Sequence, residues 1–412
     1  MRIHTKELLV LALLISPQAN AIELNNTTQI HGFLSQAAVY SPDNPYAGTD
    51  ADNGSVKFRE IGLNGYSELT PDFRLAGQIL SRQRDESDDG DVRVDFLLAD
   101  YLVWSDHSSS FGLRAGRVKN TIGFYNSIRD IPSARPGYNV PDSIYFDAFR
   151  DSLLSTDGIN LYGTALLDNN QLTWELTAGR KDVKSEDFEY FAFGYPVRKG
   201  EADDAPIYLL NVNFVPDILN NDLRLGISLV DTEIELENTQ SVAEAQMALM
   251  TAPPGDALTN PHLYVTGAKI EALYATFSAQ YNYKNWIFTS EYLHLNAKFM
   301  GEFAGMPANN RQKSHGYYFQ VEWLSTPNTT WLARYEELDL GTNGSEINYN
   351  PHRDYGKGWT VGGRWMFADN WSITGQASFN EGTAWLPSYR GIEEKQLQKY
   401  WNYYVLSLSY QF

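Results

Sequence analysis

The last ten residues of the chain, YYVLSLSYQF (403–412), change polarity at almost every step. Leu406 and Leu408 fall on one face of this stretch, whereas Ser407 and Ser409 fall on the other. A period of two is typical of a β-strand with one apolar and one polar face. A run of about ten residues matches the roughly 9–11 residues of a tilted membrane strand, whereas most soluble strands have about five or six. We therefore expect the chain to end on a strand of a membrane barrel.

The same alternation recurs along the chain, most clearly in residues 317–323, 357–367 and 371–380. Short turns and long polar loops alternate between the runs. Short turns are expected near 70–72, 105–110, 168–170, 216–221, 283–285, 325–328 and 368–370. Long loops are expected near 41–54, 84–91, 120–155, 182–204, 235–266, 300–313, 341–356 and 381–398. These connections separate about 16 strands, expected at 28–40, 55–69, 73–83, 92–104, 111–119, 156–167, 171–181, 205–215, 222–234, 267–283, 285–299, 314–324, 329–340, 357–367, 371–380 and 399–412.

The predicted fold class is all-β, a transmembrane antiparallel β-barrel with short periplasmic turns and long extracellular loops. An even number of strands places both chain ends on the same side of the membrane. Counts of about 14 or 18 strands stay open, because residues 182–266 alternate weakly.

Residues 1–21 have the features of a secretory signal peptide. Basic residues precede an apolar run over Leu8–Ile15, and Ala19-Asn20-Ala21 forms a typical cleavage site. The run is too short to cross a membrane as a helix, which takes about 20 apolar residues. We expect the mature chain, 22–412, to form a single barrel domain.

The composition excludes several classes of protein. The chain has 51 acidic against 32 basic residues, a formal charge of -19, so attraction to nucleic acid is not expected. The absence of Cys excludes disulfides and thiolate metal sites. A hydrophobic content of 43%, with 14% aromatic residues, provides apolar surface to bury and argues against disorder.

Many aromatic residues stand beside the short turns or at the end of the last strand. On a barrel they would form one ring at the periplasmic interface, where amphipathic rings are favoured. In a soluble sandwich they would instead spread along the strand centres. The members of the expected ring are Trp104, Phe111, Phe214, Tyr283, Trp286, Trp323, Trp331, Phe367, Trp371 and Phe412.

The signal peptide, the alternating strands and the terminal Tyr410-Gln411-Phe412 resemble Gram-negative outer-membrane proteins, in which a terminal Phe is associated with recognition by the barrel assembly machinery. Tyr410 and Phe412 are therefore the candidate assembly signal. The length and strand number resemble the porin superfamily over essentially the whole mature chain. The segment containing Gly116-Arg117-Val118-Lys119, Gly123-Phe124-Tyr125-Asn126, Arg129-Asp130 and Arg135-Pro136 is similar to porins predicted in marine gammaproteobacteria.

The loop over 120–155 is long enough to be functional, since loops beyond about 15 residues usually are functional or disordered. Its aromatic and Pro content indicates packing. The resemblance implies that this loop folds into the barrel and narrows it. The candidate constriction residues on the loop are Arg129, Asp130, Arg135, Asp142 and Asp147, and those on the facing basic wall are Arg114, Arg117 and Lys119. A folded surface loop or a subunit contact is the alternative.

Charged residues on the polar strand faces are expected to point into the lumen, because an Arg or Lys facing lipid at mid-depth costs about 2–4 kcal/mol. The candidate lumen wall consists of Arg74, Arg93, Arg224, Arg334, Arg364, Glu60, Glu175 and Glu322. Opposing rows of charge would create a transverse field that orients polar solutes. Alternatively, the pairs neutralise one another and stiffen the wall.

Signals for other chemistry are poor. No H-E-x-x-H, G-x-S-x-G, Walker or G-x-G-x-x-G motif is present, so we expect no catalytic residues and no cofactor. The acidic stretch 85–91 departs from the EF-hand pattern, which favours solvated loops on the lipopolysaccharide side over a metal site. Whether such loops bind divalent cations stays open.

The sequence therefore predicts a porin in the cell outer membrane of a Gram-negative bacterium that passes small hydrophilic solutes and ions by diffusion and is not an enzyme. The expected partners are outer-membrane lipid and lipopolysaccharide, the solutes and the assembly machinery, with no nucleic acid. The resemblance further implies a homotrimer. The alternatives are a channel selective for a carboxylate, phosphate or sugar, a surface receptor or adhesin, and an outer-membrane hydrolase.

Overall fold

The structure is a computed structural model that describes residues 22–46, 54–84, 89–147, 150–181, 183, 201–202, 204–237, 240–256, 263–341, 352–386 and 397–412. The expected signal peptide lies outside these residues, as do Asp50, Asp52, Glu186, Asp187 and most of the acidic stretch 85–91. Within the described helices, none is long and apolar enough to cross a membrane.

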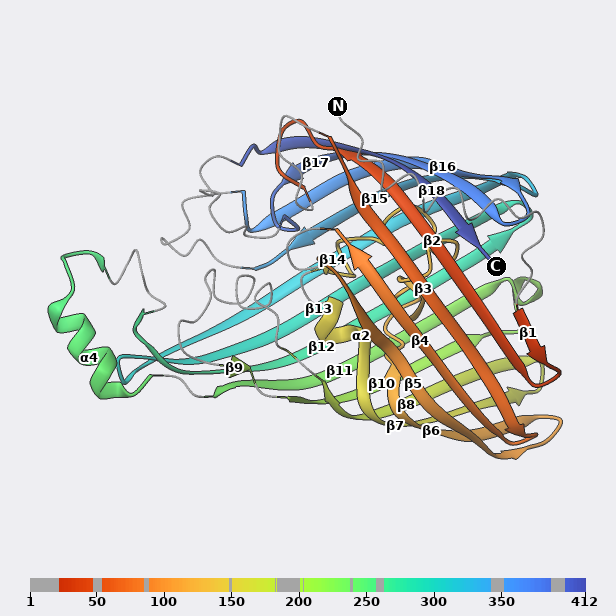
Figure 1. The fold of residues 1–412 in the computed structure, drawn as a ribbon, viewed down its shortest axis with the longest axis horizontal. Coiled ribbons are helices and arrows are strands. Elements are labelled where there is room, and N and C mark those ends of the chain that lie inside the picture. Colours follow the sequence, from red (N-terminus) through yellow and green to blue (C-terminus); the bar gives the residue numbers. More distant parts are fainter. Residues whose placement is uncertain are drawn as a thin grey trace.

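Sixteen antiparallel strands form one closed barrel, which confirms the predicted fold class and the preferred strand number (Figure 1). Each strand pairs with its neighbours in the chain, and the last strand pairs with the first to close the ring. The barrel strands are β2 (Thr28–Tyr40), β3 (Ser55–Thr70), β4 (Phe73–Gln83), β5 (Asp89–Ser105), β6 (Ser109–Lys119), β7 (Ser155–Leu167), β8 (Asn170–Lys181), β10 (Ala205–Val215), β11 (Leu223–Glu237), β12 (Val265–Tyr283), β13 (Trp286–Phe303), β14 (Met306–Thr326), β15 (Thr329–Asp339), β16 (Tyr355–Ala368), β17 (Trp371–Gly382) and β18 (Tyr400–Gln411).

Two short strands and four short helices complete the described elements. The strand β1 pairs with β2, and β9 pairs with β11. These elements are β1 (Ile22–Asn25), β9 (Glu201–Ala202), η1 (Asn126–Ile128), α2 (Arg150–Leu154), η3 (Leu219–Asn221) and α4 (Val242–Thr251). The sequence analysis missed β1, β9 and all four helices. Ser241 and Glu244 form a capping box that begins α4, a signal that the sequence contains.

The connections fall at two ends of the barrel, with the short turns at one end and α4 far beyond the other (Figure 1). One expected loop is wrong. Residues 300–313 are not a long loop, because β13 and β14 continue to a two-residue turn at Ala304-Gly305. Both turn residues have positive φ, 51° and 81°, as a tight hairpin turn requires. The polar side chains of 300–313 predicted a loop, but they lie on a hairpin that extends past the apolar band.

The two faces of the barrel differ as the alternation predicts. Leu63, Leu176 and Phe319 are exposed on the outside, whereas inward neighbours such as Thr177 and Gln320 are buried. Residues of the expected aromatic ring gather beside the short turns, where Trp286 stacks on Trp323 at 5.5 Å and Trp371 contacts Tyr410 at 4.8 Å between ring centroids. A smooth apolar surface with an aromatic rim suits contact with lipid.

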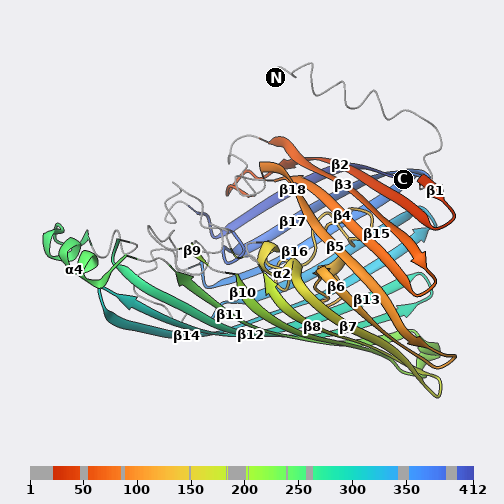
Figure 2. The same cartoon turned by 60° about the horizontal axis from the view of Figure 1, so that its bottom comes forward.

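One side of the barrel is much taller than the other (Figure 2). The strands β12, β13 and β14 have 19, 18 and 21 residues, about twice what a membrane crossing needs. On their outer faces the side chains change from apolar to charged, for example from Phe319 to Lys313 and Arg311 along β14. The charged part of this wall therefore stands beyond the apolar band.

Candidate functional site in the barrel lumen

The loop between β6 and β7 lies inside the barrel (Figures 1 and 2). Its two ends are held together by Asn120, whose main-chain N–H donates to Leu154 O at 2.9 Å. The Asn120 side chain donates to Leu153 O and accepts from the Thr156 hydroxyl. The loop thus leaves the wall through a narrow neck and re-enters it one strand further on.

A buried carboxylate on β13 anchors the loop to the wall. Glu291 accepts hydrogen bonds from the Tyr145 hydroxyl at 2.5 Å and from the Phe124 main-chain N–H at 2.8 Å. Two wall residues, Ser278 on β12 and Tyr318 on β14, donate to the same carboxylate. All four donors satisfy the negative charge, so Glu291 holds the loop at two points.

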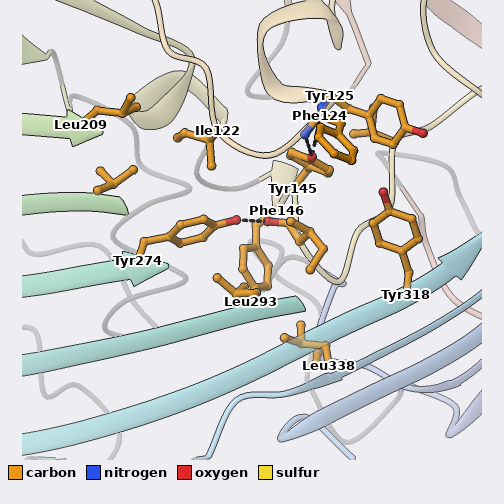
Figure 3. Close-up of a cluster of buried hydrophobic side chains, with 14 of the residues drawn as sticks. Ile122, Phe124, Tyr125, Tyr145, Phe146, Leu209, Tyr274, Leu293, Tyr318 and Leu338 are labelled. Atoms are coloured by element: carbon orange, nitrogen blue, oxygen red, sulfur yellow. Dashed lines mark hydrogen bonds between the residues drawn. The ribbon is translucent and has the colours of Figure 1, made fainter. Parts of the chain in front are cut away.

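Apolar packing surrounds this anchor (Figure 3). Ile122 and Phe146 of the loop are buried in the same cluster as Leu293 and Leu338 of the wall. The Tyr274 hydroxyl of β12 donates to Ile144 O at 2.5 Å. The loop therefore has a small hydrophobic core of its own with β12–β15, although the lumen of a barrel was expected to be wet.

Charged contacts hold the loop to the other side of the barrel. Arg135 makes a bidentate pair with Glu60 of β3, at 3.0 and 2.6 Å. Asp147 lies within 3.3 Å of Arg82, 2.8 Å of Arg84 and 3.1 Å of Arg129. Burial opposes the ionisation of Asp147, but these three guanidinium groups outweigh it and hold its pKa far below the usual range.

A third set of contacts comes from β15–β17. Arg364 donates to the main-chain oxygens of Pro132, Ser133 and Arg135, at 2.8, 2.7 and 2.7 Å. Arg334 donates to Asn139 O at 3.2 Å. Further contacts join the Ser143 N–H to Glu336 and the Tyr138 N–H to Gln376. The loop is consequently braced against strands on several sides of the lumen.

Near the neck, Asp130 lies between Lys119 and Arg150. Its carboxylate is 2.7 Å from Lys119 Nζ, and Arg150 donates to its other oxygen. Burial opposes ionisation, but Lys119 and Arg129 outweigh it and lower the pKa of Asp130. The second neighbour of Lys119 is Asp95 of β5, at 2.7 Å.

The expected constriction residues on the loop occupy two different environments. Arg129, Asp130 and Arg135 are 6%, 2% and 6% exposed and are committed to ion pairs, so their charge is compensated within the protein. Asp142 and Asp147 are partly exposed. The ion pairs of the three buried residues brace the loop inside the barrel.

The expected position of Arg117 is wrong. It lies on the outer face of β6, with Asp157 of β7 directly beside it in register. The two form a bidentate pair, with distances of 2.8 and 2.7 Å. Arg114, three residues earlier, points inward, because an odd spacing in a strand changes the face. Its guanidinium stacks on Tyr162 at 4.0 Å.

The expected wall residues lie on strand faces that point inward. Arg224 stacks on Phe124 of the loop at 4.3 Å, and Glu175 accepts from the Thr121 hydroxyl at 3.0 Å. Some wall charges keep solvent contact: the side chains of Arg74, Arg114 and Glu175 are 44%, 26% and 23% exposed. These partly exposed charges are the ones that a solute in the lumen would meet. The remaining wall candidates are Arg93, Arg334, Arg364, Glu60 and Glu322.

The sequence analysis missed the anchor Glu291 and the tyrosines around it. Glu291 stands in mid-strand between the outward Phe288 and Tyr292, so the alternation already required it to face inward. The contact between Glu291 and Tyr145 could not be predicted from the sequence, because the two residues are 146 positions apart in the chain.

No family model matches the sequence, and no curated protein matches it. Among solved structures, OmpT of Vibrio cholerae in its trimer form, described as an outer membrane protein, is 13% identical with a TM-score of 0.55, covering 94% of this chain and 99% of that one. The outer membrane channel DcaP of Acinetobacter baumannii is 8% identical with a TM-score of 0.53, covering 96% and 100%. OmpF of Salmonella typhi, in complex with daunomycin, is 12% identical with a TM-score of 0.53, covering 95% and 100%.

At these identities the likeness establishes the fold. The fold is a barrel of the porin type, as the resemblance implied, and its structural neighbours are outer-membrane proteins of Gram-negative bacteria. The match extends over nearly the whole of both chains.

Proposed function

We propose that this protein is an outer-membrane porin that lets small hydrophilic solutes and ions diffuse through its lumen. The observation that carries the proposal is a closed barrel with a polar inner wall, in which Arg74, Arg114 and Glu175 keep solvent contact while the loop beside them is braced. Diffusion needs neither a cofactor nor a catalytic residue.

Conductance tests the proposal. Purified trimer or monomer, refolded in detergent, is added to a planar lipid bilayer in about 1 M KCl. Stepwise current increases are expected, with a linear current–voltage relation at low voltage. A sample denatured by boiling serves as the control. A barrel that inserts, as shown by protease protection of its strands, but stays silent would overturn the proposal.

A substrate-selective channel is the second candidate. The observation that favours it is the bracing of one loop inside the barrel by β3, β13, β15 and β16. We propose that this loop narrows the lumen. Narrow lumens discriminate by the polar groups that line them. Carboxylates, phosphates and sugars would be added separately to a conducting channel. Block by micromolar concentrations of one class favours selectivity, whereas equal effects of all three favour a general pore.

We also infer a homotrimer. Two observations support it: the barrel fold and the trimer form of the structurally similar OmpT of Vibrio cholerae. Crosslinking in outer-membrane vesicles, followed by electrophoresis without heating, should give a band at about three times the monomer mass. A band at the monomer mass, both after crosslinking and in an unheated sample without crosslinker, would contradict the inference without affecting the channel proposal.

A further inference from the structure

Two histidines stand side by side on the outer face of the tall wall. His294 of β13 and His315 of β14 are directly opposite each other in register. Their ring centroids are 4.8 Å apart, and the two Nδ1 atoms are 3.3 Å apart. These rings have no part in the lumen, the loop or the contacts described above.

A third donor joins them. The hydroxyl of Tyr292, two residues before His294 on the same face, is 2.7 Å from His315 Nδ1. A neutral imidazole nitrogen carries either one proton or one lone pair. His315 Nδ1 can therefore form only one full hydrogen bond, although both the Tyr292 hydroxyl and His294 Nδ1 lie within hydrogen-bonding distance of it.

The spacing fits one metal ion between the two rings. Zinc binds imidazole nitrogen at about 2.0–2.1 Å with tetrahedral geometry, so two such nitrogens stand about 3.3–3.4 Å apart. The observed separation of 3.3 Å needs no movement of the strands. The Tyr292 oxygen lies 2.7 Å from His315 Nδ1, closer than two ligands of one tetrahedral zinc ion, so it would have to turn away slightly to become a third ligand. Calcium and magnesium fit poorly, because they prefer several oxygen ligands.

The place of the pair on the barrel also matters. Below it on β13 the outward side chains are Tyr292, Phe288 and Trp286, and above it comes Lys298. The pair thus lies where the apolar band ends. Within the described residues no group of three or more His, Asp or Glu side chains could hold a metal ion, so a site here would rest on the two imidazoles and their tyrosine neighbour.

We propose that His294, His315 and Tyr292 form a surface site for a divalent transition metal such as Cu²⁺, Zn²⁺ or Ni²⁺, all of which accept imidazole ligands. The site requires only the hairpin of β13 and β14, and it is independent of whether the lumen conducts. A metal bound here would cross-link the neighbouring strands β13 and β14 at the edge of the apolar band.

The test uses full-length protein refolded in detergent and purified through a tag without histidines. Cu²⁺ is titrated in and followed by electron paramagnetic resonance, with Zn²⁺ as the competitor. One Cu²⁺ per chain with two nitrogen ligands is expected. Loss of outer groups alone weakens metal sites by about 10–100-fold. His294→Ala and His315→Ala should each weaken binding at least that much and leave one nitrogen ligand.

Matched variants complete the experiment. Tyr292→Phe keeps both nitrogens and should weaken binding less than either histidine variant. His107→Ala, in the turn after β5, should leave binding unchanged. The shift in electrophoretic mobility on heating reports that each variant is folded. Equal Cu²⁺ affinity in wild type and in the His294→Ala/His315→Ala double variant, or a signal without nitrogen ligands, would overturn the proposal.

Discussion

Arg135 of the inward loop and Glu60 of β3 are joined by two hydrogen bonds in a pair whose side chains are 7% and 9% exposed. Arg82 approaches the same carboxylate at 3.5 Å. A buried pair of this kind contributes little net stability by itself, but removing one partner leaves an uncompensated charge and costs about 3–5 kcal/mol.

Glu60→Gln should therefore lower the free energy of unfolding by about 3 kcal/mol or more, because two guanidinium groups lose their shared anion. Urea unfolding in detergent, followed by tryptophan fluorescence, measures the change. Glu175→Gln is the matched control, since this wall carboxylate is 23% exposed and should cost about 1 kcal/mol or less. Equal losses in the two variants would contradict the role of the Glu60–Arg135 pair.

Glu291→Gln should release the loop without unfolding the barrel. The amide replaces one oxygen that accepts hydrogen bonds with a donor, and hydrogen bonds to charged groups contribute about 1.5–3 kcal/mol each. We expect cleavage of the loop by added protease to accelerate by roughly tenfold or more. Glu322→Gln is the control, because Glu322 accepts a hydrogen bond from a wall residue, Gln320. Unchanged protection in Glu291→Gln would argue against the anchor.

Gly316 of β14 marks the closest approach of the loop to the wall. A Cβ atom there would lie 2.0 Å from Ser143 O, a main-chain atom that cannot move alone. Gly316→Ala should therefore displace the loop near Ser143 and increase its susceptibility to protease. At Gly375 a Cβ atom would meet nothing within 4 Å, so Gly375→Ala should behave as wild type. Similar behaviour of the two alanine variants would show that the loop does not dock on β14.

Arg114 and Arg117 are three residues apart and face opposite sides of the wall. In a salt gradient, Arg114→Glu should move the reversal potential toward cation selectivity, because it replaces a positive charge in the lumen with a negative one. Arg117→Glu should leave the potential unchanged, since Arg117 pairs with Asp157 on the outside. Equal shifts would mean that the assignment of faces is wrong.

Asp142 of the loop gives the docked state a dependence on pH. Burial, with Glu336 nearby, raises the pKa of Asp142 to about 7, whereas an unfolded aspartate has a pKa near 3.9. The folded state thus holds this proton more tightly, so docking is most stable at low pH and weakens as pH rises through about 7. Protease protection of the loop should therefore fall from about pH 4 to about pH 7 and level off above that, and Asp142→Asn should remove this slope. An unchanged slope in the variant would assign the dependence to another group.

The sequence predicted the fold well because alternation is a local property. The expected bounds of β2, β4 and β10 agree with the structure to the residue. The prediction failed for 300–313, where neither face is regularly apolar because the hairpin has left the apolar band. The alternating pattern arises where one face of a strand contacts lipid, and the pattern weakens where the strand extends into water.

The candidate site was predicted only in part. That the loop is inside followed from resemblance, and its charged residues were found from their type. Their environment depends on partners far away in the chain, such as Gln376 beside Tyr138 and Arg364 beside Pro132. Residue type alone also did not reveal that Arg129 and Asp130 are buried and paired. The face of Arg117 was an avoidable error, because counting by two from Arg114 assigns it to the outside.

The final residue has a structural role of its own. The N–H of Phe412 donates to Gly32 O at 2.9 Å, and the N–H of Gly32 donates to Phe412 O at 3.1 Å. These two bonds extend the pairing of β18 with β2 by one residue beyond Gln411. An unpaired strand edge can pair with another chain. The seam between the first and last barrel strands therefore also protects this protein against edge-to-edge association.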